Sequence, residues 1–294
     1  MDNLDIAIIG GGPSGIAAAI QLKRCGYSPV LFEKYKIGGL IRSAHLVENY
    51  PGFSIGITGI VLAEKLESHL KKWQVEVYKQ EVEKVDYQDD LFKISTGCAQ
   101  YLTRILLVAS GTIPKKLNIS KLCLNNEDKV FYEIEPLLRI KNKHICIIGG
   151  GDAAFDYALN LAEHNNISIL YPSTNPRCLP LLYQRVCRNK SIKCINEVTI
   201  DNIRTENNNL TLKGLKKDHF IEIVGSCLLV AIGREENLKF IGNSLLVNKT
   251  KLENSKKLFF IGDVKNGIFR QISLAAADGI KAAMEIHIKN QGLK

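Results

Sequence analysis

Long hydrophobic runs, paired cysteines and clustered charges are all lacking in this chain of 294 residues. The longest apolar stretches, at residues 105–109 and 226–232, fall far short of the ~18 residues that a membrane span needs. The first residues show no basic segment followed by a cleavage site, so we predict no secretion signal. We therefore expect a soluble, cytoplasmic protein that does not cross a membrane.

The eight cysteines include no CxxC pair and show no zinc-ligand spacing. Without a secretion signal most of them should stay reduced, so we expect no metal site and no disulfide framework. A redox pair of Cys187 and Cys194 is one interpretation, but their spacing is not distinctive, and ordinary thiols are the simpler one. The net charge of +9 comes from lysines scattered along the chain, so we expect no nucleic-acid partner.

A strand, a glycine-rich turn, a helix and a second strand occur in that order twice. The first copy spans residues 5–33 and begins DIAIIGGGPSG, and the second spans residues 144–171 and begins HICIIGGGDAA. Each copy is typical of a buried parallel strand that turns sharply into a crossover helix. The length also favours two domains. We predict the α/β class, with two Rossmann-like, three-layer βαβ domains.

The first glycine turn has the context of a dinucleotide site. Gly10, Gly12 and Gly15 follow a strand and open a helix, and Glu33 ends the next strand. Glycines let the backbone approach a pyrophosphate, whose charge is met by N–H groups at the helix N-terminus. Glu33 can accept hydrogen bonds from ribose hydroxyls. A turn that only packs a helix on a strand is the less favoured alternative.

The second glycine turn is less complete. Gly149, Gly151 and Ala154 have the same strand-to-helix context, but Tyr171 stands where Glu33 stands in the first copy. No carboxylate is placed for the ribose of NADH, and Arg177 is the one cation available for a 2′-phosphate. A retained fold with weak or lost nucleotide binding therefore stays open as an alternative.

Five further motifs match a known family in order and spacing: GGL at 38–40, ENYPGF at 48–53, ASGTIP at 109–114, GDV at 262–264 and RQ at 270–271. Together with the glycine turns they resemble the flavin-site motifs of low-molecular-weight thioredoxin reductases, along essentially the whole chain. The resemblance implies a discontinuous FAD-binding domain, residues 1–113 and 235–294, interrupted by a NAD(P)-binding-like domain at residues 114–234. It also implies FAD as cofactor and a homodimer.

The resemblance implies roles for individual residues. Gly39, Leu40 and Asn49 would lie beside the flavin, Asp263 near the ribityl chain, and Arg270 with Gln271 near the pyrimidine edge. The full set expected to bind FAD is Gly10, Gly12, Pro13, Ser14, Gly15, Glu33, Lys34, Gly38, Gly39, Leu40, Asn49, Val82, Ala109, Ser110, Gly111, Gly262, Asp263, Arg270 and Gln271. The set expected to bind NADH or NADPH is Gly149, Gly151, Asp152, Ala153, Ala154, Arg177 and Gly233.

The sequence departs from the family at the redox dithiol. Where thioredoxin reductases carry CxxC, this chain has Tyr132, Glu133, Ile134 and Glu135, with Glu135 in the second cysteine position. Disulfide exchange needs a sulfur nucleophile, so reduction of thioredoxin by that route is excluded and no catalytic residue is assigned. The family's paired arginines for the NADPH phosphate are also missing, since Pro172 and Ser173 replace them.

These observations predict an FAD-dependent oxidoreductase in which NADH or NADPH reduces the flavin. The electrons would then leave to an acceptor that is not a dithiol, such as ferredoxin, flavodoxin, a quinone-like compound or another small molecule. Two alternatives stay open. One is a flavin-binding subunit or sensor without nicotinamide turnover, and the other is an enzyme reduced by a protein partner such as ferredoxin.

Overall fold

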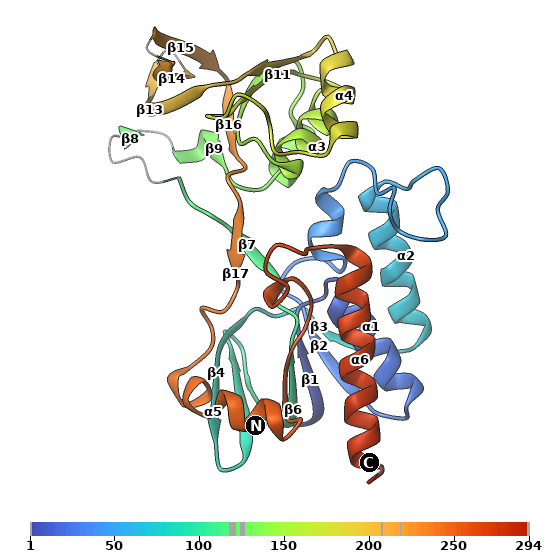
Figure 1. Ribbon diagram of the computed structural model, residues 1–294. Coiled ribbons are helices and arrows are strands. Elements are labelled where there is room, and N and C mark those ends of the chain that lie inside the picture. The colour runs from blue at the N-terminus through green and yellow to red at the C-terminus, as the bar shows by residue number, and fades with distance from the viewer. Residues whose placement is uncertain (1, 118–121, 124–126, 207, 218, 293–294) are drawn as a thin grey trace. The chain divides into compact units, whose positions relative to one another are not determined.

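The computed structural model describes residues 2–117, 122–123, 127–206, 208–217 and 219–292. The chain divides into two compact units (Figure 1). The first contains Met1–Arg42, Val47–Ile113 and Glu236–Lys294, and the second contains Ser43–Leu46 and Pro114–Glu235. Among the described residues, no helix has both the length and the apolar character needed to cross a membrane.

The first unit is built on a parallel sheet in the order β3-β2-β1-β6-β18. These strands are β1 (Asp2–Ile9), β2 (Pro29–Phe32), β3 (Glu76–Tyr78), β6 (Gln100–Val108) and β18 (Leu258–Phe260). Both faces of β1 are covered, because Ile6 and Ile8 pack into one core while Ala7 and Ile9 pack into another. Burial on both faces explains why residues 6–9 of this strand are continuously apolar rather than alternating.

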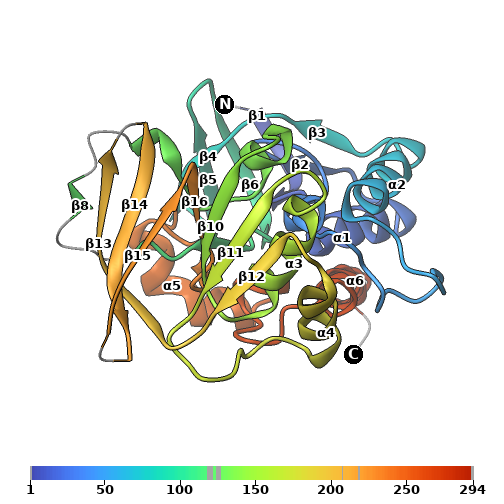
Figure 2. The ribbon, with the colours of Figure 1, turned by 90° about the horizontal axis from the view of Figure 1, so that it is seen from above.

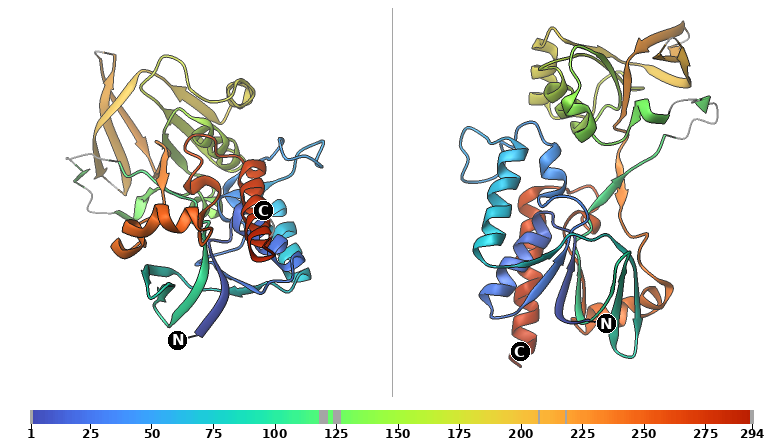
Figure 3. Two further views of the ribbon diagram at one scale, coloured as in Figure 1. Left: turned by 60° about the horizontal axis from the view of Figure 1, so that its bottom comes forward. Right: turned by 180° about the vertical axis from the view of Figure 1, so that it is seen from behind.

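Helices cover one face of this sheet, and a β-meander with one helix covers the other (Figure 3). The helical face carries α1 (Pro13–Arg24), α2 (Gly59–Lys72) and α6 (Ile272–Asn290). The opposite face carries β4 (Val82–Gln88), β5 (Leu91–Thr96) and α5 (Asn243–Asn254). A Cβ at Gly279 of α6 would overlap the Ser14 carbonyl oxygen, so this glycine lets α1 and α6 pack closely.

The second unit repeats the parallel core, in the order β12-β11-β10-β16-β9 (Figure 2). Its strands are β9 (Val130–Phe131), β10 (His144–Ile148), β11 (Asn166–Leu170), β12 (Ile192–Ile195) and β16 (Cys227–Val230). One face packs against α3 (Asp152–Leu161) and α4 (Pro180–Arg188). The other packs against a sheet of β8 (Leu122–Cys123), β13 (Val198–Glu206), β14 (Asn209–Lys216) and β15 (His219–Gly225).

The two segments that connect the units run side by side. β7 (Thr112–Pro114) and β17 (Arg234–Glu236) form a two-stranded sheet. The N–H of Lys115 donates to the Gly233 carbonyl (3.0 Å), and Gly233 adopts φ +113°, a conformation that favours glycine. Short 3₁₀ helices at Gly39–Ser43, Glu127–Lys129, Glu135–Arg139 and Gly262–Val264 complete the described elements.

Candidate cofactor sites

The three glycines of the first turn, Gly10, Gly12 and Gly15, are required for different reasons. Gly10 has φ +108°, and a Cβ there would overlap the Ala109 carbonyl oxygen, while a Cβ at Gly15 would overlap that of Gly10. Internal packing therefore requires both of these glycines. A Cβ at Gly12 would meet no atom within 4 Å. Because the fold leaves that side of Gly12 open at the N-terminus of α1, the turn fits a pyrophosphate approaching the backbone.

The turn lies at the carboxyl ends of adjacent parallel strands. The Gly10 N–H donates to the Phe32 carbonyl at the end of β2 (2.8 Å). The Ala109 N–H, just past β6, donates to the Ile9 carbonyl (2.8 Å). This edge, where strands on either side of β1 connect in opposite directions, is where open α/β sheets bind ligands.

The segment that contains Gly38 and Gly39 lies against the same turn. The Gly38 N–H donates to the Gly11 carbonyl (2.8 Å), and a Cβ at Gly39 would lie 3.3 Å from the Gly12 Cα. Both Gly38 and Gly39 have positive φ, +110° and +53°. Leu40 follows, half-buried. The fold thus brings these predicted residues next to the open side of Gly12.

Glu33 is held on the glycine turn by its own carboxylate. Its Oε2 accepts from the Gly11 N–H (2.7 Å) and its Oε1 accepts from the Tyr35 N–H (2.8 Å). Each carboxylate oxygen can accept a second hydrogen bond. The half-buried carboxylate is therefore oriented and retains acceptor capacity for ribose hydroxyls.

The side chains of two residues predicted to bind FAD, Lys34 and Val82, make other contacts. Lys34 forms an ion pair with Glu81 (3.2 Å), and Val82 is 8% exposed with its side chain in the core. Only the main chain of Val82 is left to face a ligand.

The C-terminal part of the chain returns to the start of α1. Pro13 occupies the first turn of the helix, where its missing N–H costs nothing. Ser14 is buried, and its Oγ would lie 2.5 Å from a Cβ at Gly262, which has φ +75°. The 3₁₀ turn that contains Asp263 therefore packs directly on the N-terminal turn of α1.

Asp278 of α6 secures that 3₁₀ turn and was not predicted. Its Oδ2 accepts from the Gly262 N–H (3.0 Å) and from Asn266 Nδ2 (2.8 Å), and Lys265 lies 3.6 Å from its Oδ1. The one feature of the sequence that could have pointed to Asp278 is that a carboxylate stands among the small residues of a predicted helix. Because charge-assisted hydrogen bonds are strong, Asp278 is well suited to fix the position of Asp263.

Three hydrogen bonds join segments far apart in the sequence. Asn49 Nδ2 donates to Gln271 Oε1 (2.8 Å), which brings two predicted flavin residues together. Ser110 Oγ donates to the Asn237 carbonyl (2.7 Å), and the Asn237 N–H donates to the carbonyl of Gly111 (3.1 Å). Sequence reasoning missed Asn237. These contacts tie both parts of the first unit together around the candidate site.

The second glycine turn has the same construction. Gly149 has φ +153°, and a Cβ there would overlap the Ala231 carbonyl oxygen and lie 3.2 Å from Ala154 Cβ. A Cβ at Gly151 would again meet no atom within 4 Å. Asp152 and Ala153 are exposed on the first turn of α3. This turn also leaves room for a phosphate group at a helix N-terminus.

The carboxylate acceptor of the first turn has no equivalent in the second. A Cβ at Gly150 would lie 3.1 Å from Tyr171 Cβ, and one at Gly11 would lie 3.2 Å from Glu33 Cβ, so Tyr171 and Glu33 occupy matching places. Tyr171 is 3% exposed, packs near Phe155, and burial raises its pKa to about 12. Its hydroxyl therefore stays neutral at physiological pH.

Arg177 is fastened to the second turn through its main chain. Its N–H donates to the Gly150 carbonyl (2.7 Å) while its side chain is exposed. The neighbouring loop is held as well, because Asp152 Oδ1 accepts from the Leu179 N–H (2.7 Å). These bonds hold the main chain of Arg177 and Leu179 close to the second glycine turn and to Asp152 at the start of α3.

A family profile described as pyridine nucleotide-disulphide oxidoreductase matches residues 4–279. The chain belongs to this family. Similar curated proteins include the "34.2 kDa protein in rubredoxin operon" of Clostridium pasteurianum, 29% identical over 96% of this chain and 95% of that protein. The thioredoxin reductase of Rickettsia typhi is 30% identical over 96% of each chain.

Solved structures similar to this chain confirm the predicted fold. Thioredoxin reductase from Lactococcus lactis superposes with a TM-score of 0.84 at 25% identity, over 99% of this chain and 100% of that one. Bacillithiol disulfide reductase from Bacillus cereus superposes with a TM-score of 0.76 over 98% and 100% of the two chains, but at 19% identity it supports the fold alone. The predicted resemblance and the class of two Rossmann-like domains are both confirmed.

The segment predicted to replace the dithiol of thioredoxin reductases is held by an ion pair. Arg234 donates from its two terminal nitrogens to Glu133 Oε2 (3.1 Å) and Oε1 (2.7 Å). Tyr132 lies under the Lys116 ammonium, 3.8 Å from ring centre to Nζ, and Glu135 begins a 3₁₀ helix. In this pyridine nucleotide-disulphide oxidoreductase, two side chains of the segment are therefore engaged with cations from elsewhere in the chain, Glu133 with Arg234 and Tyr132 with Lys116.

Among the described residues, the thiols outside this segment form no disulfide. Seven cysteines in the described part of the chain are free, and burial raises the pKa of Cys194 to about 11. A thiol with such a pKa is almost entirely protonated near neutral pH and is a poor nucleophile. No cluster of three or more His, Cys, Asp or Glu side chains suited to a metal ion occurs among the residues that the structure describes.

Proposed function

We propose that this oxidoreductase binds FAD in its first unit and a nicotinamide dinucleotide in its second, and that it delivers electrons to an acceptor other than a dithiol. The observation that carries the proposal is the pair of glycine turns, each open at Gly12 or Gly151, in a chain whose dithiol positions hold no sulfur. Bound FAD supplies the hydride and electron chemistry that protein side chains lack.

The residues of the first unit bind and orient the cofactor in this proposal. N–H groups at Gly12 and the start of α1 donate to the pyrophosphate, and the oriented Glu33 carboxylate accepts from ribose hydroxyls. Asp263 accepts from hydroxyls nearby. Arg270 and Gln271, at the N-terminus of α6, place positive charge and N–H donors near the pyrimidine edge, where reduction adds negative charge.

In the second unit, Arg177 selects NADPH over NADH, because Tyr171 offers no carboxylate for the ribose hydroxyls of NADH. Replacing Arg177 with alanine should weaken NADPH binding by about tenfold to a hundredfold, since hydrogen bonds to charged groups contribute about 1.5–3 kcal/mol. NADH binding should be unchanged. Calorimetry with both nucleotides checks this, with Arg188→Ala as the exposed control on α4. Equal losses for NADPH and NADH would contradict the assignment.

Anaerobic stopped-flow absorbance tests the function as a whole. We expect NADPH to bleach the flavin, with NADH acting more weakly, and thioredoxin disulfide to remain unreduced. If neither nucleotide bleaches the flavin, the proposal fails.

A small electron-carrier protein is the acceptor class that a relative favours. The relative from Clostridium pasteurianum is named after a rubredoxin operon. We therefore propose an acceptor of the rubredoxin, ferredoxin or flavodoxin kind. If NADPH does not reduce the flavin, the same kind of partner would be the electron donor. Flavin reduction by a chemically reduced ferredoxin distinguishes that second function from a flavin-binding subunit without turnover.

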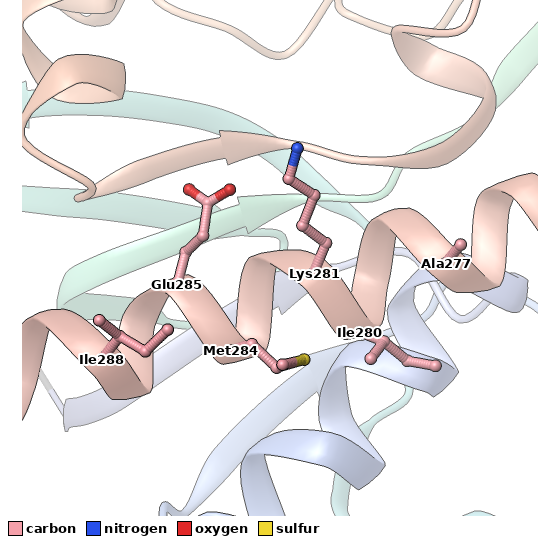
Figure 4. Close-up of a pocket in the computed structure, with 6 residues that line it drawn as sticks. All are labelled: Ala277, Ile280, Lys281, Met284, Glu285 and Ile288. Carbon is pink, nitrogen blue, oxygen red and sulfur yellow. The ribbon is translucent and has the colours of Figure 1, made fainter.

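We also propose that two copies associate through α6. Ile280, Met284 and Ile288 are 42%, 49% and 43% exposed and repeat every helical turn, along one side of a shallow pocket (Figure 4). An apolar stripe of this kind on a helix marks an interaction surface. Light scattering should give twice the chain mass of 32.7 kDa, and a monomer at micromolar concentration would contradict the proposal.

A further inference from the structure

We infer that Glu236 is a positioning residue that holds the Arg270 guanidinium and lowers the reduction potential of the bound flavin. The inference rests on the proposed function, because it concerns charge at the proposed pyrimidine edge. It assigns a role to a linker residue that none of the motifs includes.

The main chain around Glu236 is fixed on both sides. Glu236 ends β17, which pairs with β7. The next residue, Asn237, accepts from Ser110 Oγ (2.7 Å) and donates to the Gly111 carbonyl (3.1 Å). The main chain of Glu236 therefore has a defined position beside the candidate site, within reach of the residue that the carboxylate meets.

Arg270 meets this carboxylate from the start of α6. Its Nη2 lies 3.9 Å from Glu236 Oε1, with the two side chains 24% and 47% exposed. The following residue, Gln271, is the N-cap of α6 and accepts from Asn49 Nδ2 (2.8 Å). Arg270 is therefore a long, partly buried cation at a helix N-terminus, with Glu236 as its charged neighbour from another segment.

The charges at this place act in opposite directions. Arg270 and the positive end of the α6 dipole stabilise negative charge on a reduced cofactor. The Glu236 carboxylate offsets that positive charge and disfavours reduction. An ion pair at 3.9 Å whose partners both remain in contact with solvent contributes little to folding. Its effect should therefore appear in the flavin potential rather than in stability.

The test compares the midpoint potentials of the FAD-loaded wild type, Glu236→Gln and Glu235→Gln, measured anaerobically against reference dyes. Glu235 is the matched control, because it is exposed and its side chain points to the other side of the same strand. We expect Glu236→Gln to raise the equilibrium constant for two-electron reduction about threefold to tenfold, where tenfold equals about 30 mV. Glu236→Asp draws the carboxylate back from Arg270. It should raise the same equilibrium constant by a smaller factor than Glu236→Gln does.

The measured potentials test the inference separately from the proposed function. A Glu236→Gln potential equal to that of Glu235→Gln overturns the inference while the flavin site stands. A wild-type chain that binds no FAD overturns both the inference and the proposed function. If Glu236→Gln does not fold, an unshifted Glu236→Asp protein overturns the inference on its own. Thermal unfolding of all variants should stay close to that of the wild type.

Discussion

A Gly12→Val protein is expected to fold normally and to purify without flavin. The backbone at Gly12, φ −78° and ψ −175°, is open to any residue, and a Cβ there meets no protein atom within 4 Å. The valine methyl groups would instead occupy the space where a pyrophosphate approaches the helix N-terminus. We expect FAD affinity to fall at least about a hundredfold, or about 3 kcal/mol.

Flavin absorbance per chain, measured beside circular dichroism and thermal unfolding, checks this prediction. Gly15→Ala is the informative contrast, because its Cβ would overlap the Gly10 carbonyl oxygen and so disturb the turn itself. Loss of flavin in both variants, with lower stability only in Gly15→Ala, would separate ligand exclusion from misfolding. A folded Gly12→Val protein with full flavin content would remove Gly12 from the site.

The second large effect is expected from the same substitution in the other unit. Gly151→Val should keep its FAD but lose reduction by NADPH, because Gly151 has an extended backbone, φ −99° and ψ 179°, and an equally open Cβ direction. At subsaturating NADPH, the rate of flavin bleaching should fall at least about a hundredfold, equivalent to about 3 kcal/mol of lost binding.

Dithionite supplies the internal control, because it reduces flavin without the nicotinamide site and should act equally on wild type and Gly151→Val. Gly12→Val and Gly151→Val also control each other, since each introduces the same side chain at the N-cap of an equivalent helix. Unchanged bleaching by NADPH in Gly151→Val would remove Gly151 from the nucleotide site.

The sequence by itself determined the features that depend on neighbouring residues. The two glycine turns, the strands before them and Glu33 could be predicted, because a strand-to-helix turn that closely approaches a neighbouring backbone has few sequence solutions. The continuous apolar run of β1 predicted burial on both faces. The missing dithiol was equally a local fact, since residues 132–135 contain no cysteine.

Only the tertiary structure decided which distant side chains support the candidate sites. Asp278 under the turn of Asp263, Asn237 on Ser110, and Glu236 beside Arg270 join segments that no spacing rule connects. The orientation of Tyr171 into its core and the Glu133–Arg234 pair were also beyond prediction. Local backbone geometry is encoded by adjacent residues, whereas these contacts exist only once packing has brought their segments together.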